Sequence, residues 1–98
     1  TIAHEMTHIW QYLYWDKSEI EKKYGKENVL EIYEGMAKWA ELQYLILLGE
    51  TEYAKRQEVS TRMRDDEYGR GFIKYADKYP LSYETSIKNS PFNKQFPL

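Results

Sequence analysis

The sequence contains no cysteine and only two histidines among its 98 residues. Without cysteine the chain can form neither a disulfide nor a thiolate metal site, so any bound metal must be held by His, Asp or Glu. Lys and Arg total 14 against 16 Asp and Glu, so the chain lacks the basic surplus that binding to nucleic-acid phosphates requires. The composition therefore argues against a nucleic-acid partner.

Long apolar runs are also missing. The longest, residues 44–48, has five residues, whereas a membrane span needs about 20. The N-terminus carries no basic-then-apolar signal segment and begins with Thr1 rather than Met. We therefore expect no membrane span, favour a soluble, cytoplasmic protein, and expect the chain to be a piece of a longer one. Nothing in the sequence indicates the oligomeric state.

Apolar residues recur at helical steps of three and four along most of the chain, and no repeat or Gly- or Pro-rich linker divides it. This pattern predicts one mainly α domain over residues 1–98, with about four helices and an irregular tail. Helices are expected at 2–13, 28–48, 51–63 and from Asp65 or Asp66 to Pro80; residues 16–26 are expected to form a surface connection with at most a short helical turn.

The helix predicted at 28–48 is the longest and has two apolar stripes, so it should lie at the centre of the fold. The helix at 2–13 is apolar over much of its circumference, and the other two have narrower buried sides. The expected core comprises Val29, Ile32, Tyr33, Met36, Trp39, Ala40, Leu42, Tyr44, Ile46 and Leu47, with Tyr53, Ala54, Gln57 and Met63 and then Phe72, Tyr75, Ala76 and Tyr79.

Both histidines lie in one pentapeptide, His4-Glu5-Met6-Thr7-His8, which has the H-E-x-x-H pattern of zinc peptidases. Residues four apart on a helix point in nearly the same direction, so two imidazoles can reach one ion. Glu5 can then reach a water bound to that ion without being a ligand. The alternative is a surface pair, or core histidines bonded to carbonyls. We favour the metal site because uncoordinated ionisable groups would be costly to bury in so apolar a helix.

A catalytic zinc site usually takes a third protein ligand. The metzincin extension would require Gly at position 11 and His at position 14, and the chain has Gln11 and Tyr14 instead. Because no third histidine exists, the remaining ligand must be a carboxylate, as in the His, His, Glu sites called gluzincins.

The candidate carboxylates are Glu31, Glu34 and Glu41 on the helix predicted at 28–48, since Asp16 and Glu19 lie too near the first helix to fold back. Glu34 is favoured, because the 26 positions from His8 to Glu34 leave room for a loop and an antiparallel helix.

Gly35 supports the choice of Glu34. A glycine inside a helix costs about 1 kcal/mol relative to alanine and calls for a packing reason, which a close approach of the first helix would supply. Glu41 could orient a histidine through its second ring nitrogen, but we favour for it a solvated helix face with a Glu34–Lys38 ion pair.

The H-E-M-T-H-x-W opening and the Glu34-Gly35 pair resemble the peptidase domain of the LIM-domain-bearing, ubiquitin-regulated peptidases of plants, and more closely its stand-alone bacterial relatives. The resemblance covers mainly residues 1–48. It implies a zincin-like fold in which His4, His8 and Glu34 bind zinc and Glu5 is the general base. The LIM and ubiquitin-binding modules are absent, so the ubiquitin connection does not transfer. The segment 66–72 also looks like a motif, but the resemblance assigns it no role.

The expected function is a zinc metallopeptidase that cleaves a peptide or protein substrate with zinc-activated water. The oxyanion donor cannot be histidine, so Tyr68, Arg70 and Tyr33 are the candidates. Such enzymes usually hold the peptide along a sheet that precedes this helix, so we expect a helical C-terminal part of the domain that binds zinc and cleaves poorly. The alternatives are a non-catalytic helical interaction module with a remnant or structural metal site, and a zinc hydrolase that is not a peptidase.

Overall fold

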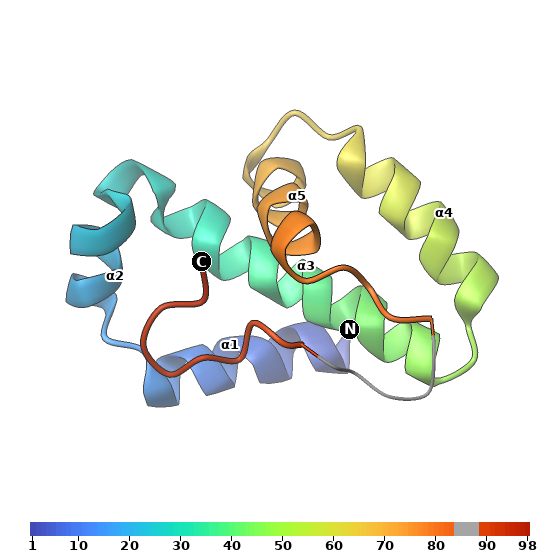
Figure 1. Ribbon diagram of the computed structural model, residues 1–98, viewed down its shortest axis with the longest axis horizontal. Coiled ribbons are helices and arrows are strands. Elements are labelled where there is room, and N and C mark those ends of the chain that lie inside the picture. The colour runs from blue at the N-terminus through green and yellow to red at the C-terminus, as the bar shows by residue number, and fades with distance from the viewer. Residues whose placement is uncertain (84–88) are drawn as a thin grey trace.

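A computed structural model describes residues 1–83 and 89–98 of the chain (Figure 1). Within those ranges the secondary structure is helical and contains no strand, which confirms the predicted fold class. The elements are α1 (Ile2–Tyr14), α2 (Lys17–Tyr24), the 3₁₀ helix η1 (Lys26–Asn28), α3 (Val29–Leu47), α4 (Thr51–Arg62) and α5 (Glu67–Lys78). No helix in the described part is long and apolar enough to cross a membrane.

The segment predicted as a surface connection, 16–26, contains the additional helix α2. Asp16 caps its N-terminus, because its carboxylate accepts hydrogen bonds from the backbone N–H groups of Ser18 and Glu19 at 2.9 and 3.4 Å. The side chain of Ile20 is fully buried and anchors the helix. One apolar residue among many charges is too weak a pattern to predict a helix, and packing against the core decides it.

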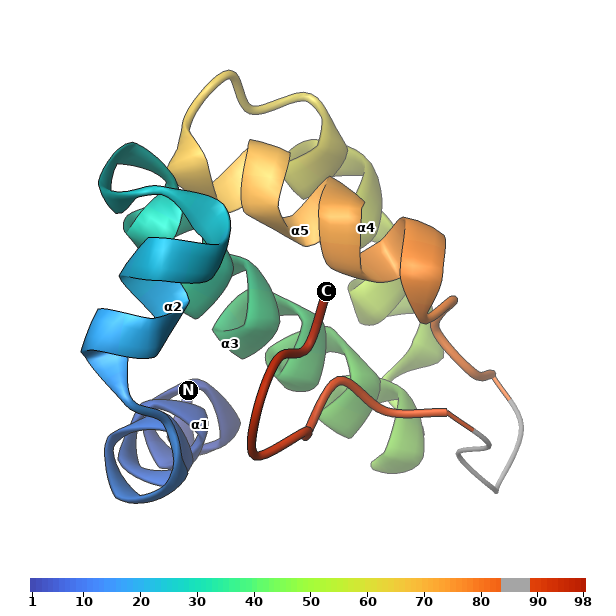
Figure 2. The ribbon, with the colours of Figure 1, turned by 60° about the vertical axis from the view of Figure 1, so that its left-hand side comes forward.

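Helix α3 lies at the centre and packs against α1, α4 and α5 (Figures 1 and 2). Its predicted role as the central helix is confirmed, although Tyr44 and Leu47 are exposed. Tyr53 and Met63 of the next helical segment are also exposed, contrary to expectation. The buried core consists of Trp15, Ile20, Ile32, Met36, Trp39, Leu42, Phe72, Tyr75 and Ala76.

Two glycines allow α3 and α5 to cross in backbone contact. A Cβ atom added to Gly35 would lie 2.4 Å from the carbonyl carbon of Gly71, and one added to Gly71 would lie 2.3 Å from the carbonyl oxygen of Glu31. Real Cβ atoms do not approach other atoms so closely. The packing reason predicted for Gly35 was therefore assigned to the wrong partner: the close neighbour is α5, not α1.

Helix α1 buries its polar side and exposes much of its apolar side. Thr7 and Gln11 are its buried residues, because both find partners: the Thr7 hydroxyl donates to the Ala3 carbonyl at 2.7 Å, and the Gln11 amide donates to the Tyr33 carbonyl at 3.0 Å. The apolar row of Ile2, Met6, Ile9 and Leu13 is more than half exposed and borders a groove of about 540 Å³. The predicted cost of burying ionisable groups in so apolar a helix therefore does not come from this row, which is not buried.

The described tail residues, 89–98, run irregularly beside α1 and end near α3 (Figure 1). Pro91 and Pro97 are buried. The Trp15 indole N–H donates to the Asn93 carbonyl at 2.8 Å, and the Tyr24 hydroxyl donates to the Leu98 carbonyl at 2.5 Å. These bonds connect α1 and α2 to the tail, so the predicted irregular wrap is confirmed for these residues.

Candidate metal centre

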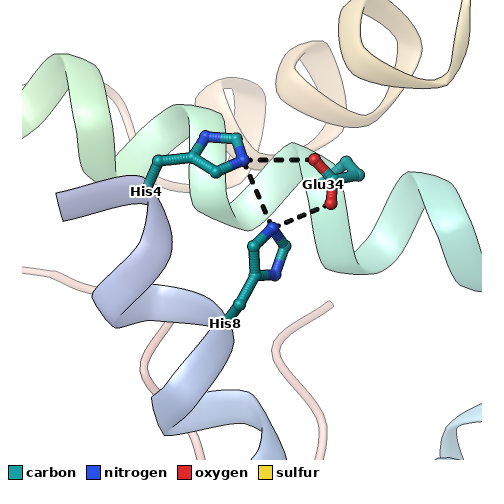
Figure 3. A group of neighbouring side chains, drawn as sticks. All are labelled: His4, His8 and Glu34. Atoms are coloured by element: carbon teal, nitrogen blue, oxygen red, sulfur yellow. Dashed lines mark hydrogen bonds and ion pairs between the residues drawn. The ribbon is translucent and has the colours of Figure 1, made fainter. Parts of the chain in front are cut away.

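Helices α1 and α3 bring His4, His8 and Glu34 together (Figure 3). The two Nε2 atoms of the histidines are 3.2 Å apart, His4 Nε2 lies 3.2 Å from Glu34 Oε2, and His8 Nε2 lies 2.8 Å from Glu34 Oε1. A tetrahedral zinc ion with bonds of 2.0–2.1 Å separates its ligand atoms by about 3.3 Å. The spacing of these three side chains therefore fits one small divalent cation.

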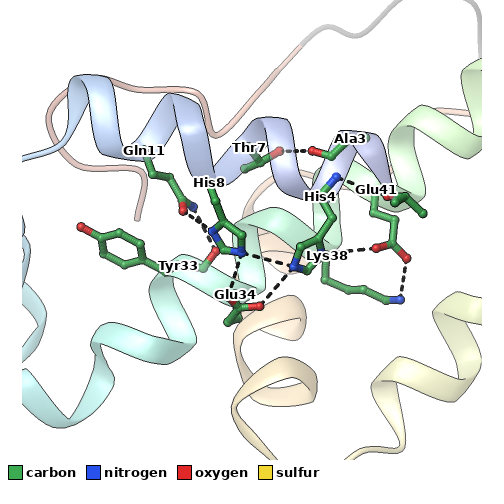
Figure 4. Close-up of polar contacts among 10 residues, drawn as sticks. Ala3, His4, Thr7, His8, Gln11, Tyr33, Glu34, Lys38 and Glu41 are labelled. Carbon is green, nitrogen blue, oxygen red and sulfur yellow. Dashed lines mark hydrogen bonds and ion pairs between the residues drawn. The ribbon is translucent and has the colours of Figure 1, made fainter.

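An acceptor oxygen lies at the outer nitrogen of each imidazole (Figure 4). His4 Nδ1 lies 3.2 Å from Glu41 Oε1, and His8 Nδ1 lies 2.8 Å from Gln11 Oε1. The Gln11 amide is oriented because its nitrogen donates to the Tyr33 carbonyl, which turns its oxygen towards His8. A carboxylate and an amide oxygen only accept, so with a cation at the two Nε2 atoms both Nδ1 atoms would carry the proton.

This assignment gives the cluster its chemistry. A neutral imidazole with its proton on Nδ1 presents a lone pair at Nε2. Two such lone pairs and the Glu34 carboxylate thus converge on one point. Three acceptors with no donor between them repel one another, whereas a cation at that point would satisfy all three.

The structure corrects the interpretation of Glu41. It does not lie on a solvated helix face, because its side chain is 13% exposed and reaches His4. Lys38 pairs with Glu41 at 2.8 Å, rather than with Glu34 as expected, and it also reaches the Gln57 side chain on α4 at 3.5 Å. Glu34 is turned towards α1 instead, where its carboxylate lies beside both histidines.

Glu31, an alternative ligand predicted from the sequence, forms ion pairs with two basic residues of α5. Arg70 Nε and Lys74 Nζ lie 2.7 and 2.5 Å from its carboxylate oxygens. Burial by itself would raise the pKa of Glu31, but hydrogen bonds from Lys74 and Arg70 outweigh that effect and lower it. Arg70 therefore joins α5 to α3 through Glu31, and its guanidinium is not directed at the histidines.

Of the three proposed oxyanion donors, Tyr68 lies nearest the cluster's carboxylate. The negative charge of Glu34 is the first cause of the raised pKa of the Tyr68 hydroxyl, followed by burial, so this phenol lies near Glu34. Tyr33 points its hydroxyl away from the histidines (Figure 4), and its ring packs edge-on against Trp15 with centroids 5.2 Å apart.

The turn before α5 holds Tyr68 in place. Asp66 accepts a hydrogen bond from the Gly69 N–H at 3.0 Å and pairs with Arg64 at 2.6 Å. A Cβ atom on Gly69 would lie 2.2 Å from the Arg64 carbonyl oxygen, so only glycine allows this tight passage of the chain. The guanidinium of Arg64 stacks on the Tyr68 ring at 4.8 Å. The motif-like segment 66–72 is thus a helix start that directs a phenol at Glu34.

Glu5 is exposed and follows His4 on α1. Its position beside His4 is dictated by the helix, and its side chain forms no hydrogen bond or ion pair with the described residues. The sequence reasoning did not identify Gln11 as a partner of His8. The spacing of three residues on one helix face was the available signal, but position 11 was used only to exclude the metzincin pattern.

The cluster is partly open to solvent. The side chains of His4, Glu34 and His8 are 15%, 13% and 28% exposed. His8 and Glu34 line a cleft of about 480 Å³ that extends between α2 and the start of α3. A small molecule or an extended peptide can therefore reach the cluster from this side.

The chain was compared with protein-family models, curated proteins and solved structures. No match was found. The interpretation of the centre therefore depends on its own geometry.

Proposed function

We propose that the protein is a zinc-dependent hydrolase of peptide bonds, with His4, His8 and Glu34 as the metal ligands. The observation that carries the proposal is the convergence of three acceptor atoms, two of them from imidazoles whose outer nitrogens are held by Gln11 and Glu41. A donor set of two nitrogens and one carboxylate oxygen is the set that catalytic zinc takes. The resemblance of the H-E-x-x-H helix and the Glu34-Gly35 pair to zinc peptidases supports the same function.

Zinc, when bound, lowers the pKa of a coordinated water towards 7 and polarises the scissile carbonyl. Glu5 accepts a proton as water attacks the peptide carbonyl, and it delivers that proton to the nitrogen of the leaving amine. Tyr68, beside Glu34, donates its hydroxyl hydrogen bond to the negative charge that develops on the carbonyl oxygen. Gln11 and Glu41 hold the imidazoles in the required tautomer.

Metal analysis tests the centre. The chain should hold about one zinc ion after dialysis against excess zinc and gel filtration, and His8→Ala and Glu34→Ala should lose it. Glu52→Ala, which removes an exposed carboxylate on α4, is the matched control and should keep zinc. Circular dichroism of each variant checks that it is folded. A metal-free wild-type chain, or Glu34→Ala with full zinc, would overturn the ligand assignment.

Hydrolysis tests the reaction. Zinc-loaded wild type should cleave a mixed library of unstructured peptides, and Glu5→Gln should keep zinc while its rate falls by at least about 100-fold, because a general base typically contributes that much. Full zinc occupancy without cleavage would instead favour a second candidate function, a helical interaction module with a structural metal site.

That second candidate is a helical interaction module with a structural metal site. The exposed apolar row on α1 favours it, since contiguous apolar surface of this kind is typical of interaction sites. The row borders the groove together with Tyr44, Leu47 and Phe92, which are also exposed. The hydrolytic proposal is preferred because a structural zinc site usually has four protein ligands, and this cluster offers three.

A further inference from the structure

The cleft beside His8 and Glu34 has an unusual charge distribution. Its floor is apolar, made by Val29, Leu30 and Tyr33 at the start of α3. Two lysines line its walls: Lys17 comes from α2 and Lys26 from η1.

These two lysines differ from the rest. The other seven lysines in the described part of the chain each contact a carboxylate or an aromatic ring; they are Lys22, Lys23, Lys38, Lys55, Lys74, Lys78 and Lys94. Neither Lys17 nor Lys26 has an ion pair, hydrogen bond or ring contact from its ammonium group among residues 1–83 and 89–98. The two lysines without such a contact in the described part of the chain therefore lie at the same cleft.

One carboxylate other than Glu34 lines the cleft, that of Glu21. After burial, the charge of Glu21 is the next cause of a raised pKa at the Tyr33 hydroxyl, so Glu21 lies near Tyr33. The two ammonium groups balance the two carboxylates of Glu21 and Glu34 that line the cleft, and a divalent ion bound to Glu34 and the histidines would leave the cleft with an excess of positive charge. A substrate group that enters here gains most if it is negatively charged.

We propose that this cleft binds a carboxylate of the substrate, with Lys17 and Lys26 as its specificity-determining residues. The inference depends on the proposed peptidase function and names its substrate class: peptides with an acidic side chain, or a free C-terminal carboxylate, next to the bond that is cleaved. The apolar floor contacts the methylene groups or backbone that carry this carboxylate.

Three sets of peptides test the inference. In each set the residues on one side of the central position are randomised, and all other residues are neutral. The first has a central Glu and an amidated C-terminus, the second has Gln in place of Glu, and the third has Gln and a free C-terminal carboxylate. Hydrolysis is measured as kcat/KM on zinc-loaded wild type. Binding is measured as Kd on zinc-loaded Glu5→Gln, so that the preference is read whether or not cleavage occurs.

The double variant Lys17→Gln/Lys26→Gln should lose about tenfold in kcat/KM and affinity for the preferred acidic peptide, because two exposed ion pairs together are worth about 1–2 kcal/mol. Its values for the neutral peptide should stay unchanged. Lys22→Gln/Lys55→Gln removes the same charge outside the cleft and should change neither. Glu21→Gln should increase the acidic preference, and 0.5 M salt should reduce it.

The outcomes separate the two proposals. If wild type prefers the Glu peptides to the Gln peptides and Lys17→Gln/Lys26→Gln abolishes this preference, the cleft binds an acidic side chain. If wild type prefers only the third set, the cleft binds a C-terminal carboxylate. Equal values for all three sets, no measurable binding of any, or an equal loss in both double variants would overturn the cleft proposal. An acidic preference in binding without hydrolysis by wild type would support the cleft and overturn the peptidase function.

Discussion

Substituting Gly35 with alanine tests whether the crossing of α3 and α5 is built as described. The new Cβ atom would lie 2.4 Å from the Gly71 carbonyl carbon, whereas ordinary contact begins at 3.4 Å. The helices would therefore have to separate by about 1 Å (3.4 − 2.4) at a contact made of two backbones. Neither side can move away by changing a side-chain rotamer.

The expected magnitude combines two opposing effects. Overpacking of a well-packed core costs about 1–3 kcal/mol, and a backbone clash belongs at the upper end of that range. Alanine improves helix propensity over glycine by about 1 kcal/mol. The net loss is about 2 kcal/mol in the free energy of unfolding, which lowers Tm by about 8–16 °C for a domain of this size.

Thermal unfolding followed by circular dichroism measures this loss. Gly49→Ala is the control, since nothing lies within 4 Å of its Cβ and its φ of +87° costs an alanine about 1–2 kcal/mol by local strain alone. Gly35→Ala should keep zinc, because α1 is not part of the crossing. Its rate of hydrolysis should fall, because Tyr68 on α5 shifts relative to Glu34. Gly49→Ala should change neither the zinc content nor the rate of hydrolysis. A Gly35→Ala variant as stable as wild type would refute the close crossing.

Three further predictions concern the surroundings of the centre. Gln11→Ala and Glu41→Ala should each weaken zinc affinity by about 10- to 100-fold in a competition titration with a chelator. Glu41→Gln keeps an acceptor for His4 and should retain most of the zinc affinity. Tyr68→Phe should keep zinc and lose about 100-fold in kcat, because one oxyanion donor is removed. Glu31→Gln should destabilise the fold by about 1–2 kcal/mol in urea unfolding at pH 7 by weakening the bonds from Arg70 and Lys74.

The effect of Glu31 should depend on pH in a defined direction. Its pKa is lowered in the folded state, so its contribution is fully present above the unfolded value of about 4.3 and is lost as the pH falls through the lower folded pKa. The difference between wild type and Glu31→Gln should therefore disappear in acid. A stability difference that persists at pH 2.5 would contradict this account of Glu31.

The other two predictions also have outcomes that would contradict them. Unchanged zinc affinity in Gln11→Ala would contradict the tautomer assignment of His8. Full activity in Tyr68→Phe would exclude the phenol as the oxyanion donor.

Much of the helical layout could be predicted from the sequence. Apolar spacing located α1, α3, α4 and α5, because a helix of a dozen or more residues repeats its pattern often enough to be recognised. The short helix α2 was missed, since its single core residue, Ile20, gives no periodicity. The buried side of α1 was also predicted wrongly: Thr7 and Gln11 are buried because partners on the backbone and on α3 accept their hydrogen bonds, and a count of apolar residues contains no information about those partners.

The candidate site divides in the same way. That His4 and His8 can meet one ion follows from the helical repeat, and the absence of cysteine and of a third histidine required a carboxylate. The sequence left Glu31, Glu34 and Glu41 as alternatives for it. Only the packed structure distinguishes them, since it directs Glu34 to the histidines, Glu41 to the outer nitrogen of His4, and Glu31 to α5.

By itself, the sequence determined a mainly helical protein with two imidazoles one helical turn apart that can reach one ion, because those features depend on residues within four positions of each other. The tertiary structure alone decided which carboxylate meets the histidines, that Tyr68 and not Tyr33 lies near that carboxylate, and the gathering of Lys17 and Lys26 at one cleft. These depend on segments far apart in the chain. Their meeting is dictated by which helix faces pack together, above all where the backbones of α3 and α5 touch, and no local pattern encodes that contact.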